Sequence, residues 1–260
     1  MEQLYTLEFF YNFLFLMALL CIVIFVTLYF VDAGYGKMRT EKWGPSINNK
    51  VGWFLMEAPV FIVMLYLWGL SNVRFQVPYF IFFLIFQFHY FQRSFIFPFL
   101  LKGNSRMPIV IMALSVLWNL INGYVQGVWL FYLAPTYQPY SSSWLLSWQF
   151  ILGTVIFAIG WIINMHSDYV IRHLRKPGDN NHYLPQKGMY RYVTSANYLG
   201  EITEWLGWSI LTWSWAGALF FLLTCSNLIP RANSIYHRYE EEFPQQFDRK
   251  RLKRIIPFIY

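Results

Sequence analysis

The sequence predicts an all-α integral membrane protein with seven transmembrane helices. The chain has 260 residues, of which 57% are hydrophobic and 13% are charged, and its mean hydropathy is +0.36. A soluble domain carries roughly 25% charged residues, so these values indicate that lipid is the main solvent of the chain. We expect a single membrane-embedded domain that covers residues 1–260.

Seven apolar runs are long enough, or nearly so, to cross a bilayer as helices of about 20 residues. The first run is too long for a secretory signal peptide and lacks a basic start, so it is expected to be a span. The sixth run is short and polar for a span. The predicted spans cover residues 7–31, 52–70, 77–101, 107–133, 145–167, 196–210 and 214–236.

The basic residues predict the orientation of these spans. If the N-terminus lies outside, all 20 Lys and Arg residues except Arg74 and Arg93 fall on the cytosolic side or in the tail. Cytoplasmic segments of membrane proteins carry such an excess. The pattern therefore favours seven spans, with the N-terminus outside and the C-terminus in the cytosol. A bacterial inner membrane and an endoplasmic reticulum membrane suit it equally.

The net charge of +7 comes from this cytosolic collar. A basic collar attracts anionic lipid headgroups, and it would also attract an anionic cofactor from the cytosol. It does not indicate nucleic-acid binding, because no compact basic domain exists to present it. No obligate protein partner is evident from the sequence.

Residues 163–178 carry four polar side chains at spacings that stack them on one helical face. An amide, a carboxylate and two guanidiniums at the rim of a span are costly in lipid, so they favour a site for an anionic ligand. A solvated helix end with snorkelling arginines is the alternative. The four residues are Asn164, Asp168, Arg172 and Arg175.

The long connection at 168–196 contains turn signals and is predicted to be an irregular loop. Such long loops in compact proteins are often functional. The tail at 237–260 ends in an apolar stretch after a basic run. We expect that stretch to fold back onto the protein or the bilayer interface.

Two side chains within the spans can donate hydrogen bonds in an apolar surrounding. Glu57 lies early in the second span, where a carboxyl group favours its neutral form and can donate a hydrogen bond. A structural tie to a backbone carbonyl or to Arg93 is the alternative. Tyr90 lies in the third span, where a phenol can polarise a carbonyl oxygen. A packed aromatic side chain is the alternative reading of Tyr90.

A third polar cluster follows Asn197 in the sixth span. Glu201 and Glu204 share this short segment, and two carboxylates could indicate a metal site. No His follows at the spacing of a Glu-x-x-His di-metal site, so no metal is expected. Contact with a polar ligand, or pairing with the arginines, is favoured instead. No glycine-rich dinucleotide fingerprint is present, so any nucleotide must be held by the helices and the cytosolic loop.

Several segments resemble the membrane steroid 5α-reductases, in order and across nearly the whole chain. They are GYGK at 34–37, WFLMEAP at 53–59, HYFQRSF at 89–95, NMHSDYVIRHLRKPG at 164–178, YVTSANYLGEITEWLGW at 192–208 and IPFIY at 256–260. The chain departs from the usual family pattern at Phe97, Leu184 and the tail segment 233–238.

This resemblance implies a seven-helix enzyme that uses NADPH to reduce the 4,5 double bond of a 3-oxo-Δ4 steroid to the 5α product. In that family a Glu and a Tyr hold the steroid 3-oxo group, and those positions match Glu57 and Tyr90. The positions that contact NADPH match Tyr35, Trp53, Arg106, Asn164, Asp168, Arg175, Tyr183, Asn197, Glu201, Arg231 and Tyr239. The steroid, or a similar lipid substrate, would enter from the bilayer.

Three other functions remain open at this point. One is a reductase of another lipid enone, such as a polyprenol or an enoyl thioester. A second is a membrane methyltransferase that uses a different nucleotide cofactor. The third is a non-enzymatic seven-span transporter or receptor, although transporters often show internal repeats or paired broken helices, and neither is seen here.

Overall fold

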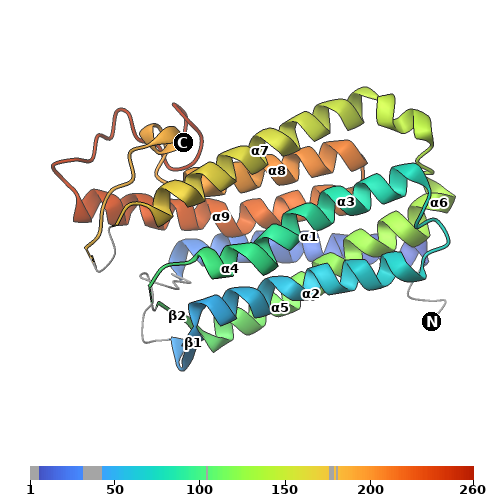
Figure 1. Cartoon of the computed structure of the whole chain (residues 1–260), viewed down its shortest axis with the longest axis horizontal. Helices are drawn as coiled ribbons and strands as arrows, with labels where there is room; N and C mark the ends of the chain where they lie inside the picture. The colour runs from blue at the N-terminus through green and yellow to red at the C-terminus, as the bar shows by residue number, and fades with distance from the viewer. Residues whose placement is uncertain (1–5, 32–42, 104, 176–178, 180) are drawn as a thin grey trace. The chain divides into compact units, whose positions relative to one another are not determined.

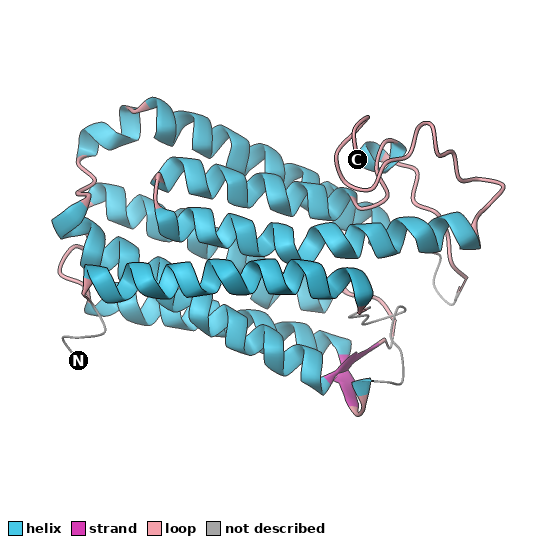
Figure 2. Ribbon diagram, turned by 180° about the vertical axis from the view of Figure 1, so that it is seen from behind, coloured by secondary structure: helices cyan, strands magenta, loops and turns pink. Residues whose placement is uncertain are grey.

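The computed structural model describes residues 6–31, 43–103, 105–175, 179 and 181–260. Figures 1 and 2 show that these residues are mostly helical, with one small pair of strands. The all-α prediction is therefore confirmed. The chain forms two compact units, Met1–Phe15 with Ala33–Phe150 and Leu16–Asp32 with Ile151–Tyr260. They are called the first and second units below; the single domain predicted for residues 1–260 stays a prediction.

The first unit is built around the packing of α2 (Asn49–Leu70) against α5 (Ile109–Val128). Strands β1 (Ser46–Asn48) and β2 (Arg106–Pro108) pair antiparallel directly before these two helices. The pairing fixes the starting points of α2 and α5 side by side. Gly123 and Gly127 on α5 then admit Val63 and Leu67 of α2 at close range, as small residues do in membrane helix pairs.

Two π-helical turns interrupt the helices of the first unit. The segment η4 (Gln92–Ile96) joins α3 (Val77–Phe91) to α4 (Phe97–Leu100), and η5 (Trp129–Leu133) joins α5 to α6 (Ala134–Tyr137). Each precedes a proline, Pro98 or Pro135, at the start of the next helix. A proline lacks an N–H and clashes with the carbonyl four residues earlier, so the preceding turn widens. The carbonyl of Phe131, four residues before Pro135, accepts a hydrogen bond from Ser71 Oγ at 3.2 Å. A short 3-10 helix, η6 (Ser142–Leu146), follows α6.

The described residues of the second unit form most of α1 (Leu7–Phe30), three further long helices and a short 3-10 helix. The three further helices are α7 (Trp148–Arg172), α8 (Ala196–Thr212) and α9 (Trp215–Glu242), and the 3-10 helix is η7 (Gly188–Arg191). Figure 1 shows α7 and α8 running alongside each other. Glycines spaced seven residues apart on each helix let the two backbones touch. A Cβ added at Gly160 would lie 2.7 Å from Gly200 O, and one added at Gly207 would lie 2.6 Å from Gly153 O. Side chains are thus excluded from the centre of this crossing.

The tail folds back onto the second unit, as the apolar terminus predicts. Val193 pairs with Lys253 in a parallel β-bridge, and the Tyr29 and Tyr260 hydroxyls are 3.0 Å apart. Arg254 lies over the rings of Tyr236 and Tyr260, at 4.6 and 4.9 Å from their centroids. These contacts fix residues 252–260 against α9 and the end of α1 (Leu7–Phe30).

Each predicted span corresponds to helical structure, with shifted ends. The fifth begins at Trp148 rather than residue 145 and continues to Arg172, because the polar residues after position 167 remain helical. Helix α9 extends six residues past the predicted end, to Glu242.

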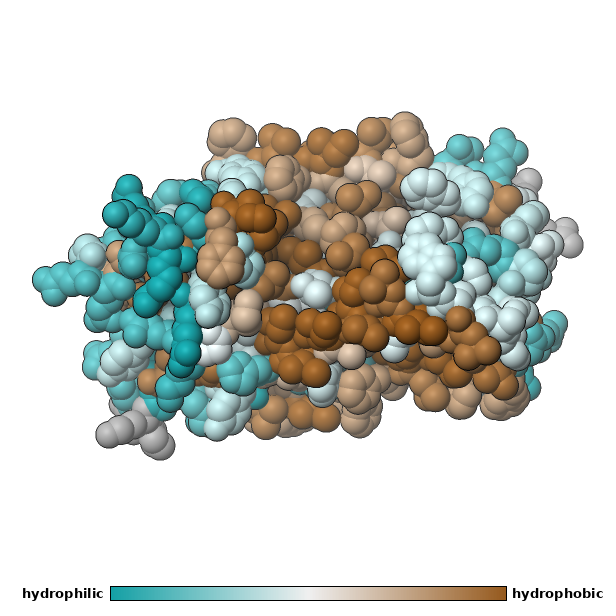
Figure 3. All heavy atoms as spheres, turned by 90° about the horizontal axis from the view of Figure 1, so that it is seen from above, coloured by the Kyte–Doolittle hydropathy of each residue, from teal (hydrophilic) through white to brown (hydrophobic). Residues whose placement is uncertain are grey.

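Five helical segments among the described residues are long and apolar enough to cross a membrane, as expected of a multi-pass membrane protein. They are Leu7–Phe30, Asn49–Leu70, Val77–Leu100, Ile109–Tyr137 and Trp148–Arg172. Figure 3 shows apolar side chains over much of the visible surface.

Candidate functional site

Glu57 lies in α2, one turn after Trp53, and is held by an amide from α5. Asn119 Nδ2 donates to the Met56 carbonyl at 2.5 Å and to Glu57 Oε2 at 3.2 Å. The Glu57 side chain is half-buried. The carboxyl group therefore accepts a hydrogen bond from a side chain on the facing helix.

Tyr90 lies in the last turn of α3 and is only 3% exposed. Its ring packs against Phe86 at a centroid distance of 4.8 Å, and its hydroxyl oxygen accepts a hydrogen bond from Asn122 Nδ2 at 3.2 Å. Asn122 follows Asn119 by three residues, so both amides lie on one face of α5. The structure thus brings the two predicted catalytic residues to the same face of α5.

Trp53 and Arg106, two predicted cofactor contacts, have different surroundings in the first unit. Trp53 is buried, with Arg93 over its ring at 4.7 Å and Phe97 edge-on at 4.9 Å. Arg106 is exposed in β2 and donates to both Oγ and O of Ser46, at 3.0 and 2.5 Å. Tyr35, a third predicted contact, lies outside the described residues.

In the second unit, α7 presents a buried polar face. Asn164, Ser167 and Asp168 are 1%, 0% and 5% exposed. Asn164 Nδ2 donates to the Asn197 carbonyl at the start of α8, at 2.9 Å. Within the described part of the chain, Asn164 Oδ1 and Ser167 Oγ are buried without a hydrogen-bond partner. Buried polar atoms rarely lack a hydrogen-bond partner. This face of α7 is therefore suited to a ligand that supplies N–H or O–H donors.

Tyr190 connects several of the predicted residues. It is 1% exposed, and its hydroxyl donates to Asn197 Oδ1 at 3.2 Å. Burial raises the pKa of Tyr190 well above its ordinary value, and the nearby Asp168 and Tyr239 raise it further. Asp168, Asn197 and Tyr239 therefore lie around one neutral phenol.

Arg175 lies past the end of α7, so it does not share the helical face that its spacing predicts. Burial and the neighbouring Glu242 raise the pKa of Tyr239 to about 12, and Arg238 and Arg175 oppose the shift. Arg175 is consequently close to Tyr239, which lies near the end of α9.

The loop after α7 is tied both to itself and to α9. The exposed Tyr183 donates to Asp179 Oδ2 at 2.8 Å, and His182 Nδ1 is paired with Glu242 Oε1. Two other predicted contacts, Glu201 on α8 and Arg231 on α9, are half-buried. Among the described residues, no group of three or more His, Cys, Asp or Glu side chains is placed to hold a metal ion.

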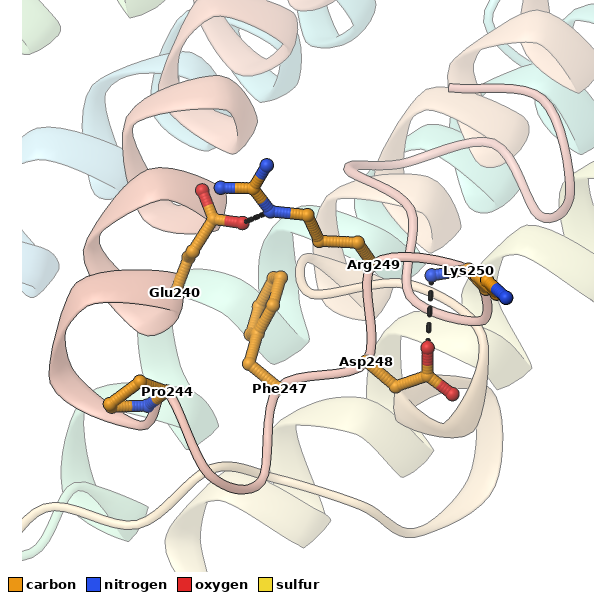
Figure 4. A pocket seen from close by; sticks show the side chains of 6 residues that line it. All are labelled: Glu240, Pro244, Phe247, Asp248, Arg249 and Lys250. Carbon is orange, nitrogen blue, oxygen red and sulfur yellow. Dashed lines mark hydrogen bonds and ion pairs between the residues drawn. The ribbon is translucent and has the colours of Figure 1, made fainter.

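An open pocket of about 430 Å³ lies at the end of α9 and contains none of the predicted site residues. Figure 4 shows Glu240 and Arg249 pointing toward each other across it, and Asp248 bonded to the Lys250 backbone N–H. These contacts are typical of a surface turn, so we do not assign the reaction to this pocket.

Comparison with known proteins identifies the family. Residues 105–260 match the family model described as 3-oxo-5-alpha-steroid 4-dehydrogenase. The chain belongs to this family.

Relatives support the family assignment over nearly the full length. The steroid 5-alpha-reductase DET2 of Gossypium hirsutum is 37% identical over 239 residues, which is 90% of this chain and 91% of the relative. The protein named 3-oxo-5-alpha-steroid 4-dehydrogenase 1 in Mus musculus is 33% identical over 242 residues, or 92% of each chain. As a member of the 3-oxo-5-alpha-steroid 4-dehydrogenase family, the chain is an oxidoreductase that acts on CH–CH bonds, and this chemistry implies a nicotinamide cofactor.

Sequence reasoning missed Asn119, Asn122 and Tyr190. The two asparagines carried a usable signal, because amides are costly inside an apolar span and mark functional positions there. Tyr190 carried only a weak signal, the Gly188 breaker before it.

Proposed function

We propose that the protein reduces the 4,5 double bond of a 3-oxo-Δ4 steroid to the 5α-reduced 3-oxo steroid, with NADPH as the reductant. Family membership and the names of the relatives support a steroid substrate. The observation that carries the proposal is the pairing of Glu57 and Tyr90 with adjacent amides of α5. Two side chains that can donate O–H hydrogen bonds are thereby held at one face of α5.

Glu57 and Tyr90 are assigned to the steroid 3-oxo group. Hydride addition to the β-carbon of a conjugated enone builds negative charge on the carbonyl oxygen. Donors already aimed at that oxygen bind the transition state better than the ground state. The role requires the Glu57 carboxyl group to carry its proton.

The polar face of α7 is assigned to NADPH, which supplies the hydride when bound. The open acceptors Asn164 Oδ1 and Ser167 Oγ fit a ligand with N–H and O–H donors. Arginines suit phosphate groups, because the guanidinium fork matches their oxygens. The residues assigned to the cofactor are Tyr35, Trp53, Arg106, Asn164, Asp168, Arg175, Tyr183, Asn197, Glu201, Arg231 and Tyr239.

The proposal includes the topology and the membrane. The basic collar supports seven spans with an outside N-terminus and a cytosolic C-terminus. Helix α8 has 17 residues, short for a span unless it is tilted little or the bilayer is thin. The steroid would enter from the bilayer, and NADPH from the cytosolic side of a bacterial inner membrane or an endoplasmic reticulum membrane.

The test is turnover of purified protein with NADPH and a 3-oxo-Δ4 steroid, followed by identification of the 5α product. Tyr90→Phe should lower kcat by roughly 100-fold or more, as loss of an oxyanion donor does. Glu57→Gln should also lower kcat, because an amide N–H is a weaker donor than a carboxyl O–H. The Kd for NADPH should stay within about threefold, because neither residue is assigned to the cofactor.

Three controls separate the other functions. A polyprenol and an enoyl thioester test the other reductases, and thermal stabilisation by NADPH but not by S-adenosylmethionine argues against a methyltransferase. Full activity in both variants, or equal losses of kcat and NADPH affinity, would contradict the assigned roles.

A further inference from the structure

Three amide side chains form a polar row on α5, a helix that is otherwise mostly apolar. Asn119, Asn122 and Gln126 follow one another at steps of three and four, so they share one face. Asn122 and Gln126 are 5% and 1% exposed. Buried amides inside a membrane helix are costly unless their hydrogen bonds are made, and here the bonds lead to the two residues assigned to the steroid ketone.

Asn119 orients the carboxyl group of Glu57. Its Nδ2 reaches both the Met56 carbonyl and Glu57 Oε2, at 2.5 and 3.2 Å. An amide nitrogen carries two N–H donors and cannot accept. In a neutral carboxyl group, the carbonyl oxygen is the better acceptor of such a bond. Donation to Oε2 therefore favours the proton on Oε1, the oxygen that must donate to the ketone.

Asn122 orients the hydroxyl of Tyr90 in the same way. Its Nδ2 donates to the phenol oxygen at 3.2 Å, so the Tyr90 proton must point in another direction. A hydroxyl that accepts one hydrogen bond is also a stronger donor in the next. Gln126 Nε2 donates to Asn122 Oδ1 at 3.4 Å, which turns the nitrogen end of the Asn122 amide toward Tyr90.

We infer that Asn119 and Asn122 are positioning residues for the reduction, each fixing the direction in which one donor offers its proton to the substrate ketone. Asn119 acts through Glu57, and Asn122 acts through Tyr90. The inference rests on the proposed function, because it gives Glu57 and Tyr90 the roles assigned above.

The decisive experiment is a pair of double-mutant cycles measured by single-turnover rates. Asn122→Leu should slow the wild-type protein by roughly 10- to 100-fold, the range found for outer partners of metal ligands. It should slow Tyr90→Phe by less than about twofold, because its target hydroxyl is gone. Asn119→Leu should behave likewise with Glu57→Ala, because Glu57→Gln would keep an oxygen that accepts from Asn119. The crossed pair, Asn122→Leu in Glu57→Ala, should show nearly its full effect.

Controls separate positioning from general damage to the fold. Ser115 lies on the same helix, and its Oγ donates to the Ile111 carbonyl at 2.9 Å. Because that bond stays within α5, Ser115→Ala should leave the rate unchanged. Asn122→Asp keeps the size of the side chain and removes the amide donors. If the melting temperature and NADPH affinity of Asn122→Leu show that it does not fold, Asn122→Asp replaces it in the cycle.

The outcomes are distinguishable. Rate losses that multiply in both cycles would overturn the positioning roles and leave the proposed function intact, provided that Glu57→Gln and Tyr90→Phe themselves remain slow. Normal rates in those two single variants would overturn the proposed function, and the inference with it.

Discussion

The crossing of α7 and α8 predicts that Gly200→Ala destabilises the protein. The added Cβ would lie 2.4 Å from the backbone N of Asn164 and 2.7 Å from its Cα, whereas ordinary Cβ contacts are 3.4–4 Å. Both neighbours are backbone atoms and cannot rotate away. The helices must therefore part by about 1 Å, which also stretches the bond from Asn164 to the Asn197 carbonyl.

The expected cost follows from two opposing effects. Overpacking in a close-packed interior costs typically about 1–3 kcal/mol. Alanine is more favourable than glycine inside a helix by about 1 kcal/mol, which offsets part of that cost. Because the crowded neighbours are backbone atoms, the overpacking cost should lie at the upper end, about 2–3 kcal/mol, which leaves a net loss of about 1–2 kcal/mol. For a chain of this size, that lowers the melting temperature by roughly 2–8 °C.

Thermal unfolding of the detergent-solubilised protein, at one scan rate, measures this loss. Gly69→Ala in α2 is the matched control, because a Cβ there meets nothing within 4 Å. That variant should be neutral or more stable by up to about 1 kcal/mol. If Gly200→Ala melts at or above the wild-type temperature, the close backbone contact does not exist in solution.

Three further predictions concern other contacts. Arg254→Met should lower the melting temperature by removing about 1–3 kcal/mol, from the cation–π contacts with Tyr236 and Tyr260 and from the hydrogen bond to Asn233. A melting curve like that of the wild type would show that these contacts do not stabilise the protein. Ser71→Ala should lower the free energy of unfolding by about 1–3 kcal/mol, because it removes the hydroxyl that donates to the Phe131 carbonyl in η5. An unchanged melting temperature would show that this hydrogen bond does not stabilise the π turn. The pKa of Tyr239 is raised from 10.0 to about 12 in the folded protein. Between pH 10 and 12 the folded state therefore keeps a proton that the unfolded chain has lost, so the free energy of unfolding falls as the pH rises. The melting temperature of Tyr239→Phe should fall less than that of the wild type over this range, and equal slopes would contradict the assignment.

The helices were predictable because each apolar run is long enough to imply one. Their ends were not, since residues 168–172 continue α7 as a polar helix after hydrophobicity stops marking it. The α7–α8 contact depends on pairs of glycines that lie 40 and 54 residues apart in the sequence but touch in space, and helix periodicity within either run does not predict such pairs. The paired positions are Gly153 with Gly207 and Gly160 with Gly200.

The candidate site divides in the same way. Motifs identified Glu57, Tyr90 and the α7 face, because intramembrane polar groups stand out against an apolar background. Asn119 and Asn122 stood out equally but lay in no recognised motif. The role of Tyr190 could not be predicted, since it depends on a loop placing the phenol beside Asn197.

The π turn at 92–96 also decides which aromatic ring faces which helix. In an uninterrupted α-helix, residues seven apart lie nearly in line, so Tyr90 and Phe97 would face the same neighbour. The wider turn puts them out of phase: Tyr90 contacts Asn122 of α5, and Phe97 packs on Trp53 of α2. If this turn were α-helical with the same number of residues, the two rings would align and compete for a single neighbour, whereas deleting one residue from it would keep them about 120° out of phase.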